Sequence, residues 1–182
     1  MSTETMMSNG KGIPLEASSF LVENVNILPK GRVFDVAMGS GRNAIYLAKS
    51  GFVVEGVDIS AEAIKHTLES AKQEGVKISA RVADLEGNYR IKQAAHEVII
   101  CFNCLQRSLI PQIKDGLRRG GVVVYETFTV DHAQFRKPKN PAHLLKHNEL
   151  LDMFRDFRCH RYWEGIIEAE KKAIASIIAE KT

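Results

Sequence analysis

The clearest chemical signal in this chain is a glycine loop framed by aspartates. The stretch Asp35-Val-Ala-Met-Gly39-Ser-Gly41 follows an apolar run and leads into a helix-like segment. Glycines let the backbone turn tightly and approach a ligand, and the start of a helix offers unpaired N–H groups. Asp58 lies 19 residues after Gly39, where a carboxylate suits the two hydroxyls of a ribose. The pattern predicts a site for a cofactor that contains a nucleoside, although structural turn glycines would also explain the loop.

Asp35 distinguishes between the cofactors that such a loop could bind. It ends the first predicted strand and faces the loop where a dinucleotide would place its pyrophosphate. A carboxylate there repels that doubly anionic group and attracts a cation. S-adenosylmethionine (SAM) has no phosphate and carries a sulfonium and an ammonium. Asp35 therefore favours SAM over a nicotinamide cofactor, with capping of the turn or the helix as the structural alternative.

At these residues the sequence resembles a known family. The run VFDVAMGSGRNAIYLAKSGFVVEGVDIS is similar to motif I and the acidic second-strand motif of class I SAM-dependent methyltransferases. The segment GRNAIYLA most resembles the branch of tellurite-resistance methyltransferases, and the resemblance extends over nearly the whole chain from about Leu15. It implies a seven-stranded sheet whose last strand is antiparallel, SAM as the cofactor and methyl transfer as the activity.

The resemblance also implies which residues bind the cofactor. Asp35, Gly39 and Gly41 would line its methionine part, and Asp58 would hold the ribose. Ile59 would pack on the adenine, whose edge Asp84 and the Leu85 backbone would read. The cofactor-binding residues implied in this way are Asp35, Ala37, Gly39, Gly41, Asn43, Asp58, Ile59, Asp84 and Leu85.

Two features depart from the family pattern. Ala37 stands where the family has its first loop glycine, so one methyl group narrows the space beside the cofactor. The connection from Asp84 to His96 is short for a complete crossover helix. Two alternatives to a methyltransferase stay open: a protein that binds SAM without turnover, and a nicotinamide-dependent oxidoreductase.

The residues after the fourth and fifth predicted strands are candidates for the acceptor side. Asn103 and Arg107 follow the fourth strand, and Glu126 ends the fifth; we expect any catalytic group among these three. Arg107 and Glu126 could equally form a surface ion pair or a helix cap. The position that reads Pro-Pro-aromatic in nucleic-acid amino-methyltransferases is Cys-Phe-Asn-Cys here, which favours a small-molecule substrate over nucleic acid.

A basic segment follows the fifth strand. Residues 132–147 (HAQFRKPKNPAHLLKH) contain three histidines, an arginine, three lysines and no acidic residue. If this segment forms a lid over the site, its positive charge favours an anionic acceptor. The alternative is that it is a solvated loop without a binding role. The histidines lack metal-ligand spacing, so we expect no metal and place His132, His143 and His147 at the surface. Trp163 is expected to pack within the last strand pair.

The elements that must position these residues alternate along the chain. Strands are predicted at 32–37, 52–59, 77–83, 97–102, 122–129, 157–163 and 172–179. Helices are predicted at 15–28, 43–50, 60–74, 110–119 and 148–154, with Ser60 and Asn148 as N-caps. Such alternation indicates an α/β fold with three layers, a Rossmann-like, mostly parallel sheet that binds ligands at the carboxyl ends of its strands.

Composition limits the class of protein. The 182 residues are 45% hydrophobic and 26% charged, with a net charge of +3, which predicts one folded domain and excludes general disorder. We expect a polar, flexible tail over residues 1–12 and a single domain over 13–182. No apolar run is long enough to span a membrane, and three cysteines without an export signal favour the cytoplasm. A monomer or a homodimer is expected.

Overall fold

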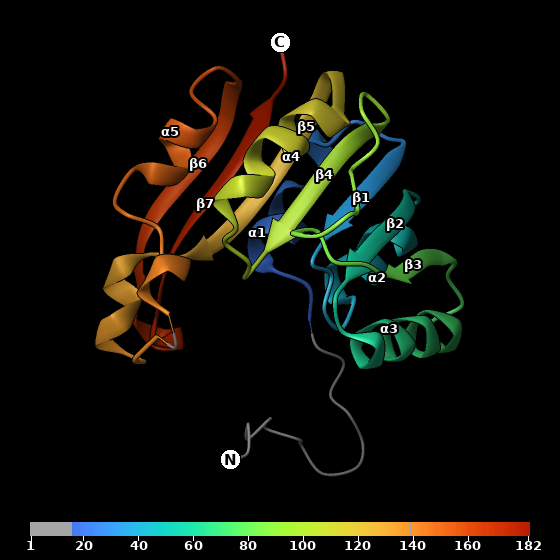
Figure 1. Cartoon of the computed structure of the whole chain (residues 1–182), viewed down its shortest axis with the longest axis horizontal. Helices are drawn as coiled ribbons and strands as arrows, with labels where there is room; N and C mark the ends of the chain where they lie inside the picture. Colours follow the sequence, from blue (N-terminus) through green and yellow to red (C-terminus); the bar gives the residue numbers. More distant parts are fainter. Residues whose placement is uncertain (1–15, 139) are drawn as a thin grey trace.

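The computed structural model describes residues 16–138 and 140–182, so the predicted tail over residues 1–12 lies outside the described part. Its centre is one seven-stranded sheet in the order β3-β2-β1-β4-β5-β7-β6 (Figure 1). Strand β7 is antiparallel to both of its neighbours, and the other strands are parallel to one another. The strands are β1 (Arg32–Val36), β2 (Val53–Asp58), β3 (Ile78–Val82), β4 (His96–Phe102), β5 (Leu117–Phe128), β6 (Arg158–Ile167) and β7 (Lys172–Glu180).

Helices cover both faces of the sheet and complete the predicted three layers. Helices α1 (Ser19–Asn24), α2 (Arg42–Lys49) and α3 (Ala61–Gln73) lie on one face, and α4 (Ile110–Gly116) and α5 (Glu149–Met153) lie on the other. In Figure 1, α4 passes in front of the sheet and α1 lies behind it. Short 3₁₀ turns occur at Val25–Ile27, Arg107–Leu109, Val130–Gln134, Pro141–His143 and Glu168–Glu170.

The core consists of one apolar cluster on each face of the sheet. Phe34, Ile99 and Tyr125 pack under α4 and α5, while Val33, Val98 and Ile100 pack under the other helices. Neighbouring residues of the central strands therefore point to opposite faces and are buried on both. This double burial explains why these strands read as continuous apolar runs in the sequence.

The sequence predicted the order of the elements correctly but was wrong about the end of one helix and about the side-chain cap of another. The predicted helix over 110–119 ends at Gly116, because Leu117 already pairs with His96 as the start of β5. Ser60 caps α3 by accepting from the Ala63 N–H at 3.2 Å, as expected. Asn148 stands at the start of α5 with a φ of 61°, but its side chain makes no capping hydrogen bond.

In the described residues no helix has both the length and the apolar character needed to cross a membrane.

Candidate functional site

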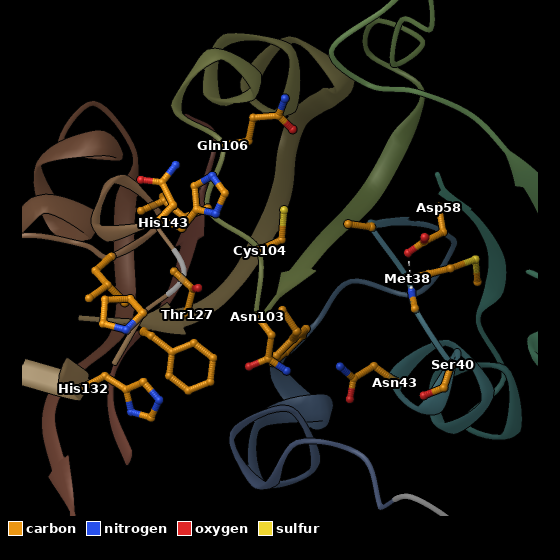
Figure 2. A pocket seen from close by; sticks show the side chains of 18 of the residues that line it. Met38, Ser40, Asn43, Asp58, Asn103, Cys104, Gln106, Thr127, His132 and His143 are labelled. Carbon is orange, nitrogen blue, oxygen red and sulfur yellow. Dashed lines mark hydrogen bonds between the residues drawn. The ribbon is translucent and has the colours of Figure 1, made fainter. Parts of the chain in front are cut away.

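A cavity of about 860 Å³ opens at the carboxyl ends of β1, β4 and β5. Its volume lies in the upper part of the range of about 300–1,000 Å³ that ligand pockets occupy. One wall is the glycine loop with the end of β2, and the opposite wall is the segment between β5 and α5. Figure 2 shows these two walls and the residues between them: Met38, Ser40, Asn43 and Asp58 face His132 and His143 across Asn103, Cys104 and Thr127.

Asp35 lies at the floor of this cavity. Its residue is only 3% exposed, and it pairs in the sheet with Gly56 of β2 and Ile100 of β4. Burial, with a smaller contribution from the Asp58 charge, raises the pKa of the Asp35 carboxyl well above its usual range. A carboxylate in this position is stabilised by a cation placed in the cavity, because nearby positive charge favours its ionised form.

Asp58 holds the glycine loop in place. One carboxylate oxygen accepts from the Gly39 N–H at 2.8 Å, and the other accepts from the Ser60 N–H at 2.9 Å. Gly39 has a φ of 53°, and a Cβ built on it meets nothing within 4 Å, so the backbone there borders open space. Asp58 therefore orders the loop from the end of β2 and still presents free lone pairs toward the cavity.

Thr67 is a second anchor of the loop that the sequence did not reveal. Its hydroxyl donates to the Gly39 carbonyl at 3.0 Å, and the residue is fully buried on α3. Gly41 passes so close to Thr67 that an added Cβ would lie 2.4 Å from the threonine methyl carbon. A glycine is therefore required at position 41 both for space and for its φ of 73°. The only sequence signal for Thr67 is a polar residue on an otherwise apolar helix face.

Ala37 also adopts the left-handed backbone region. Its φ is 55°, a conformation that costs a residue with a Cβ about 1–2 kcal/mol. Ala37 lines the cavity beside Asp35. The family glycine that the sequence lacks would adopt this conformation without that cost.

Asn43 connects the cofactor wall through Ser18 to Glu126 of β5. It lines the cavity, and its Oδ1 accepts from the Ser18 N–H at 2.9 Å. The Ser18 hydroxyl donates in turn to Oε1 of Glu126 at 3.2 Å. Glu126, an expected acceptor-side residue, does not line this cavity; it faces a second hollow on the sheet face that carries α1. The polar chain from Asn43 to Glu126 could not be found from the sequence, because its members lie far apart along it.

Four of the expected cofactor residues are not on the lining of the cavity: Gly41, which packs on Thr67, and Ile59, Asp84 and Leu85. Ile59 is 71% exposed at the end of β2, where its side chain is open to a flat ligand. Asp84 accepts from the Glu86 N–H at 2.9 Å, which shapes the turn after β3, and Leu85 is buried in that turn. Their roles at the adenine stay predictions.

The residues after β4 form the floor between the two walls. Asn103 has a φ of 55° and donates its N–H to the Glu126 carbonyl at 2.9 Å, so its side chain stands in the cavity. Cys104 also lines the cavity, and a hydrogen bond from Cys101 lowers the pKa of its thiol. The side-chain nitrogen of Gln106 is buried at the cavity without a hydrogen-bond partner among the described residues. Gln106 therefore lines the cavity through its other atoms.

The basic segment forms the wall opposite the glycine loop. Four of its cationic or titratable side chains line the cavity, namely His132, Arg136, Lys137 and His143. Lys139 lies outside the described residues. The expectation that all three histidines lie at the surface is wrong for His132, which is half-buried and stacks on Phe128 with ring centroids 4.2 Å apart. Packing against that ring explains the difference.

Arg107 anchors this wall and does not line the cavity. Its guanidinium forms two hydrogen bonds with the Glu149 carboxylate, at 2.6 and 2.8 Å, and donates to the carbonyls of Ala142 and Leu144. The ion pair that the sequence left open as an alternative for Arg107 is thus the observed arrangement. The bonds to two carbonyls tie the basic segment to the start of α4.

The residues of the glycine-loop wall fit SAM. Asp35 is a buried carboxylate whose described neighbours include no hydrogen-bond donor to it, and the loop beside it leaves space for close approach of a ligand. When bound, SAM supplies a methyl group activated by a sulfonium. No group of three or more possible metal ligands occurs among residues 16–138 and 140–182.

Comparisons with known proteins agree with this geometry. The family model described as tellurite resistance protein TehB matches residues 14–175. The probable SAM-dependent methyltransferase TehB of Haemophilus influenzae is 25% identical over 159 residues, which cover 83% of this chain and 54% of that protein. A ubiquinone biosynthesis O-methyltransferase of Actinobacillus pleuropneumoniae is 26% identical over 117 residues, covering 59% and 50%. The chain thus spans about half the length of these curated relatives.

A solved structure shows the same fold. The crystal structure of TehB from Haemophilus influenzae superposes with a TM-score of 0.76 at 21% identity, covering 91% of this chain and 63% of that one. Its similarity extends over the sheet and both helical layers described above. The family match sets aside the nicotinamide alternative, in agreement with the buried Asp35 at the loop. The chain belongs to the tellurite resistance protein TehB family, within the class I SAM-dependent methyltransferases.

Proposed function

We propose that this chain transfers a methyl group from SAM to a small anionic acceptor. The observation that carries the proposal is the opposite charge of the two cavity walls. Three acidic residues, Asp35, Asp58 and Glu86, and one arginine, Arg42, line the glycine-loop side, which is therefore acidic on balance, and the basic side chains of residues 132–143 line the other. A cation and an anion bound in one cavity would each be drawn to their own wall and would meet between them.

Positioning is the main contribution that such a reaction needs from the protein. Methyl transfer from a sulfonium has a good neutral leaving group, so holding the nucleophile close to the methyl carbon does most of the catalysis. Asp35 would orient the cationic part of SAM, and Asp58 would hold the ribose. An anionic acceptor is already a nucleophile, so no general base is required.

The acceptor would be held at the opposite wall and the floor. Arg136 and Lys137 offer positive charge at the wall, and the Asn103 side chain offers a polar group at the floor. The name of the family points to tellurite as a first anion to test. Selenite, a carboxylate and a neutral phenol extend the test to other acceptor classes.

The test is a measurement of S-adenosylhomocysteine released from SAM with each acceptor. We expect release with an oxyanion or a carboxylate and none with the neutral phenol. In the double variant Arg136→Ala with Lys137→Ala, the KM for the anion should rise about tenfold while the affinity for SAM stays unchanged, because only the acceptor wall changes. Arg155→Ala, an exposed arginine outside the cavity, is the matched control.

The outcomes separate the proposal from its alternative. Turnover of the neutral phenol at the same rate as the anions would contradict the anionic acceptor. Tight binding of SAM without release on any acceptor would favour a protein that binds SAM without turnover. The left-handed Ala37 is the observation that motivates that second candidate.

A further inference from the structure

A second hollow lies on the face of the sheet that carries α1. It encloses about 530 Å³ between α1 and the outer strands β6 and β7, and it shares no lining residue with the first cavity. Six residues define its chemistry: Phe20, Glu126, Arg161, Trp163, Ile174 and Ser176. The proposed methyl transfer uses none of this space.

A buried carboxylate forms the floor of this hollow. Glu126 is 6% exposed, and its two oxygens accept from Ser18 Oγ at 3.2 Å and Ser176 Oγ at 2.9 Å. Among the described residues, no lysine, arginine or histidine nitrogen lies within 4.0 Å of it. Two neutral hydroxyls replace only part of the solvation that a carboxylate loses on burial, so a cation in the hollow would stabilise it.

An aromatic side chain lies two strands away from the carboxylate, in the same row of the sheet. Ser176 pairs with Glu126 on one side and with Trp163 on the other, so the three residues form one row across β5, β7 and β6. Trp163 is 41% exposed, and its ring lies over Gly165 of the same strand, so it packs in part within the last strand pair, as the sequence predicted. A partly exposed indole and a carboxylate that line one hollow can both attract an organic ammonium placed between them.

The other charges of the hollow limit the ligand. Lys172 is paired with Glu170 at 2.8 Å, and Glu23 adds a second carboxylate from α1. Arg161 lines the hollow and has no carboxylate within 4.0 Å among the described residues. Arg161 and Lys172 repel any cation, and the repulsion grows with the charge of the ligand, so a single cationic group is disfavoured less than a polycation.

From this arrangement we infer that the hollow is a binding site for a small organic cation with a single ammonium group, distinct from the SAM cavity. The Glu126 carboxylate supplies the countercharge, and Trp163 with Phe20 supplies the apolar contact. The inference is independent of the proposed methyl transfer, because it rests on residues that do not line the SAM cavity.

The chain carries its own reporter for this site. Trp163 is the only tryptophan in the sequence, so its fluorescence reports on the hollow alone. Choline serves as the probe, and 3,3-dimethyl-1-butanol, its uncharged carbon isostere, serves as the control, both at constant ionic strength. We expect a saturable change with choline below about 10 mM and none with the alcohol.

Two variants test the assigned roles. Glu126→Gln removes the countercharge and keeps a hydrogen-bond acceptor, and it should weaken choline binding at least tenfold. Trp163→Leu, measured by calorimetry, should weaken it about three- to thirtyfold, because the ring face is lost. Since Trp163 is partly exposed, this variant keeps the test available if Glu126→Gln does not fold.

Three results would overturn the inference. The first is the absence of saturable choline binding. The second is equal binding of choline and its uncharged isostere, which would make the hollow merely apolar. The third is a tryptophan emission that depends on protein concentration and not on choline, which would assign the face to a second copy of this chain.

Discussion

At the scale of single residues, the site depends on an aspartate kept in an unfavourable place. Asp35 is buried at the cavity floor without a donor to its carboxylate, and burial raises its pKa. Such an acid stabilises the folded state when neutral, below its ordinary pKa of 3.8, and that contribution is lost as the pH rises through the higher folded value. The charge that would bind the cofactor therefore destabilises the ligand-free protein at neutral pH.

Replacing Asp35 by Asn separates stability from binding. We expect Asp35→Asn to raise the free energy of unfolding of the ligand-free protein by about 1–2 kcal/mol at neutral pH, since the uncompensated charge is gone. Urea denaturation measures that gain, and the difference from the parent protein should shrink toward low pH. Calorimetry should show at least a tenfold loss of SAM affinity. A variant that is less stable at neutral pH and binds SAM normally would contradict this role.

Ala37 is the second residue of the site that is held in an unfavourable state, because its backbone has a positive φ although it carries a Cβ. Ala37→Gly should tighten SAM binding about two- to fivefold, because a methyl group beside the cofactor is removed, and should stabilise the protein by up to about 1 kcal/mol. Ala94 also has a positive φ, of 46°, but lies outside the cavity, so Ala94→Gly is the matched control. Calorimetry and thermal unfolding measure both variants. Equal effects of the two on SAM affinity would exclude crowding by the Ala37 methyl group.

At the scale of elements, the cavity lies between the glycine loop and the basic segment, and each of these walls is fixed by contacts with other elements. The glycine loop is fixed by Asp58 from β2 and by Thr67 from α3. The basic segment is fixed to the sheet by parallel pairing of Thr129 with Leu145 and to α4 by Arg107. The two walls therefore belong to different parts of the sheet, and we expect them to respond separately to mutation.

Arg107→Ala tests whether the basic wall is positioned through that anchor. The Arg107 side chain is 40% exposed, so the loss of stability should be below about 1 kcal/mol. Amide exchange should accelerate across residues 140–149, and the acceptor KM should rise while SAM affinity stays unchanged. Glu149→Gln removes the same ion pair and keeps the arginine bonds to the two carbonyls, so it should have the smaller effect. An unchanged KM with faster exchange would show that the segment does not position the acceptor.

At the scale of the whole molecule, three acidic or basic side chains are buried in the described strands of the sheet, and each lies in a different place. Asp35 lies beneath the SAM cavity, Glu126 lies beneath the second hollow, and His96 lies near the amino end of β4. His96 is 1% exposed and packs on Phe34, and neither ring nitrogen has a hydrogen-bond partner among the described residues. Burial lowers its pKa, although the Glu55 carboxylate, 3.5 Å away, acts in the opposite direction.

His96 makes the stability of the fold depend on pH. Because its folded pKa is below the ordinary value of 6.5, the unfolded chain binds the proton more readily, and stability falls as the pH drops below about 6.5. In His96→Phe this part of the dependence should disappear, leaving a flatter profile between about pH 5 and 7. Urea unfolding across that range measures both proteins. An identical slope in the two would assign the pH dependence to other groups.

The sequence by itself determined the order of strands and helices, the glycine loop with its two aspartates, and the class of cofactor. These features depend on neighbouring residues, on the apolar periodicity and on the backbone needs of a tight turn. The tertiary structure alone decided that Thr67 and Ser18 anchor the loop wall and that Glu126 faces away from the SAM cavity. Contacts between distant segments follow from register and from which face of a strand each residue occupies, and no local pattern encodes them.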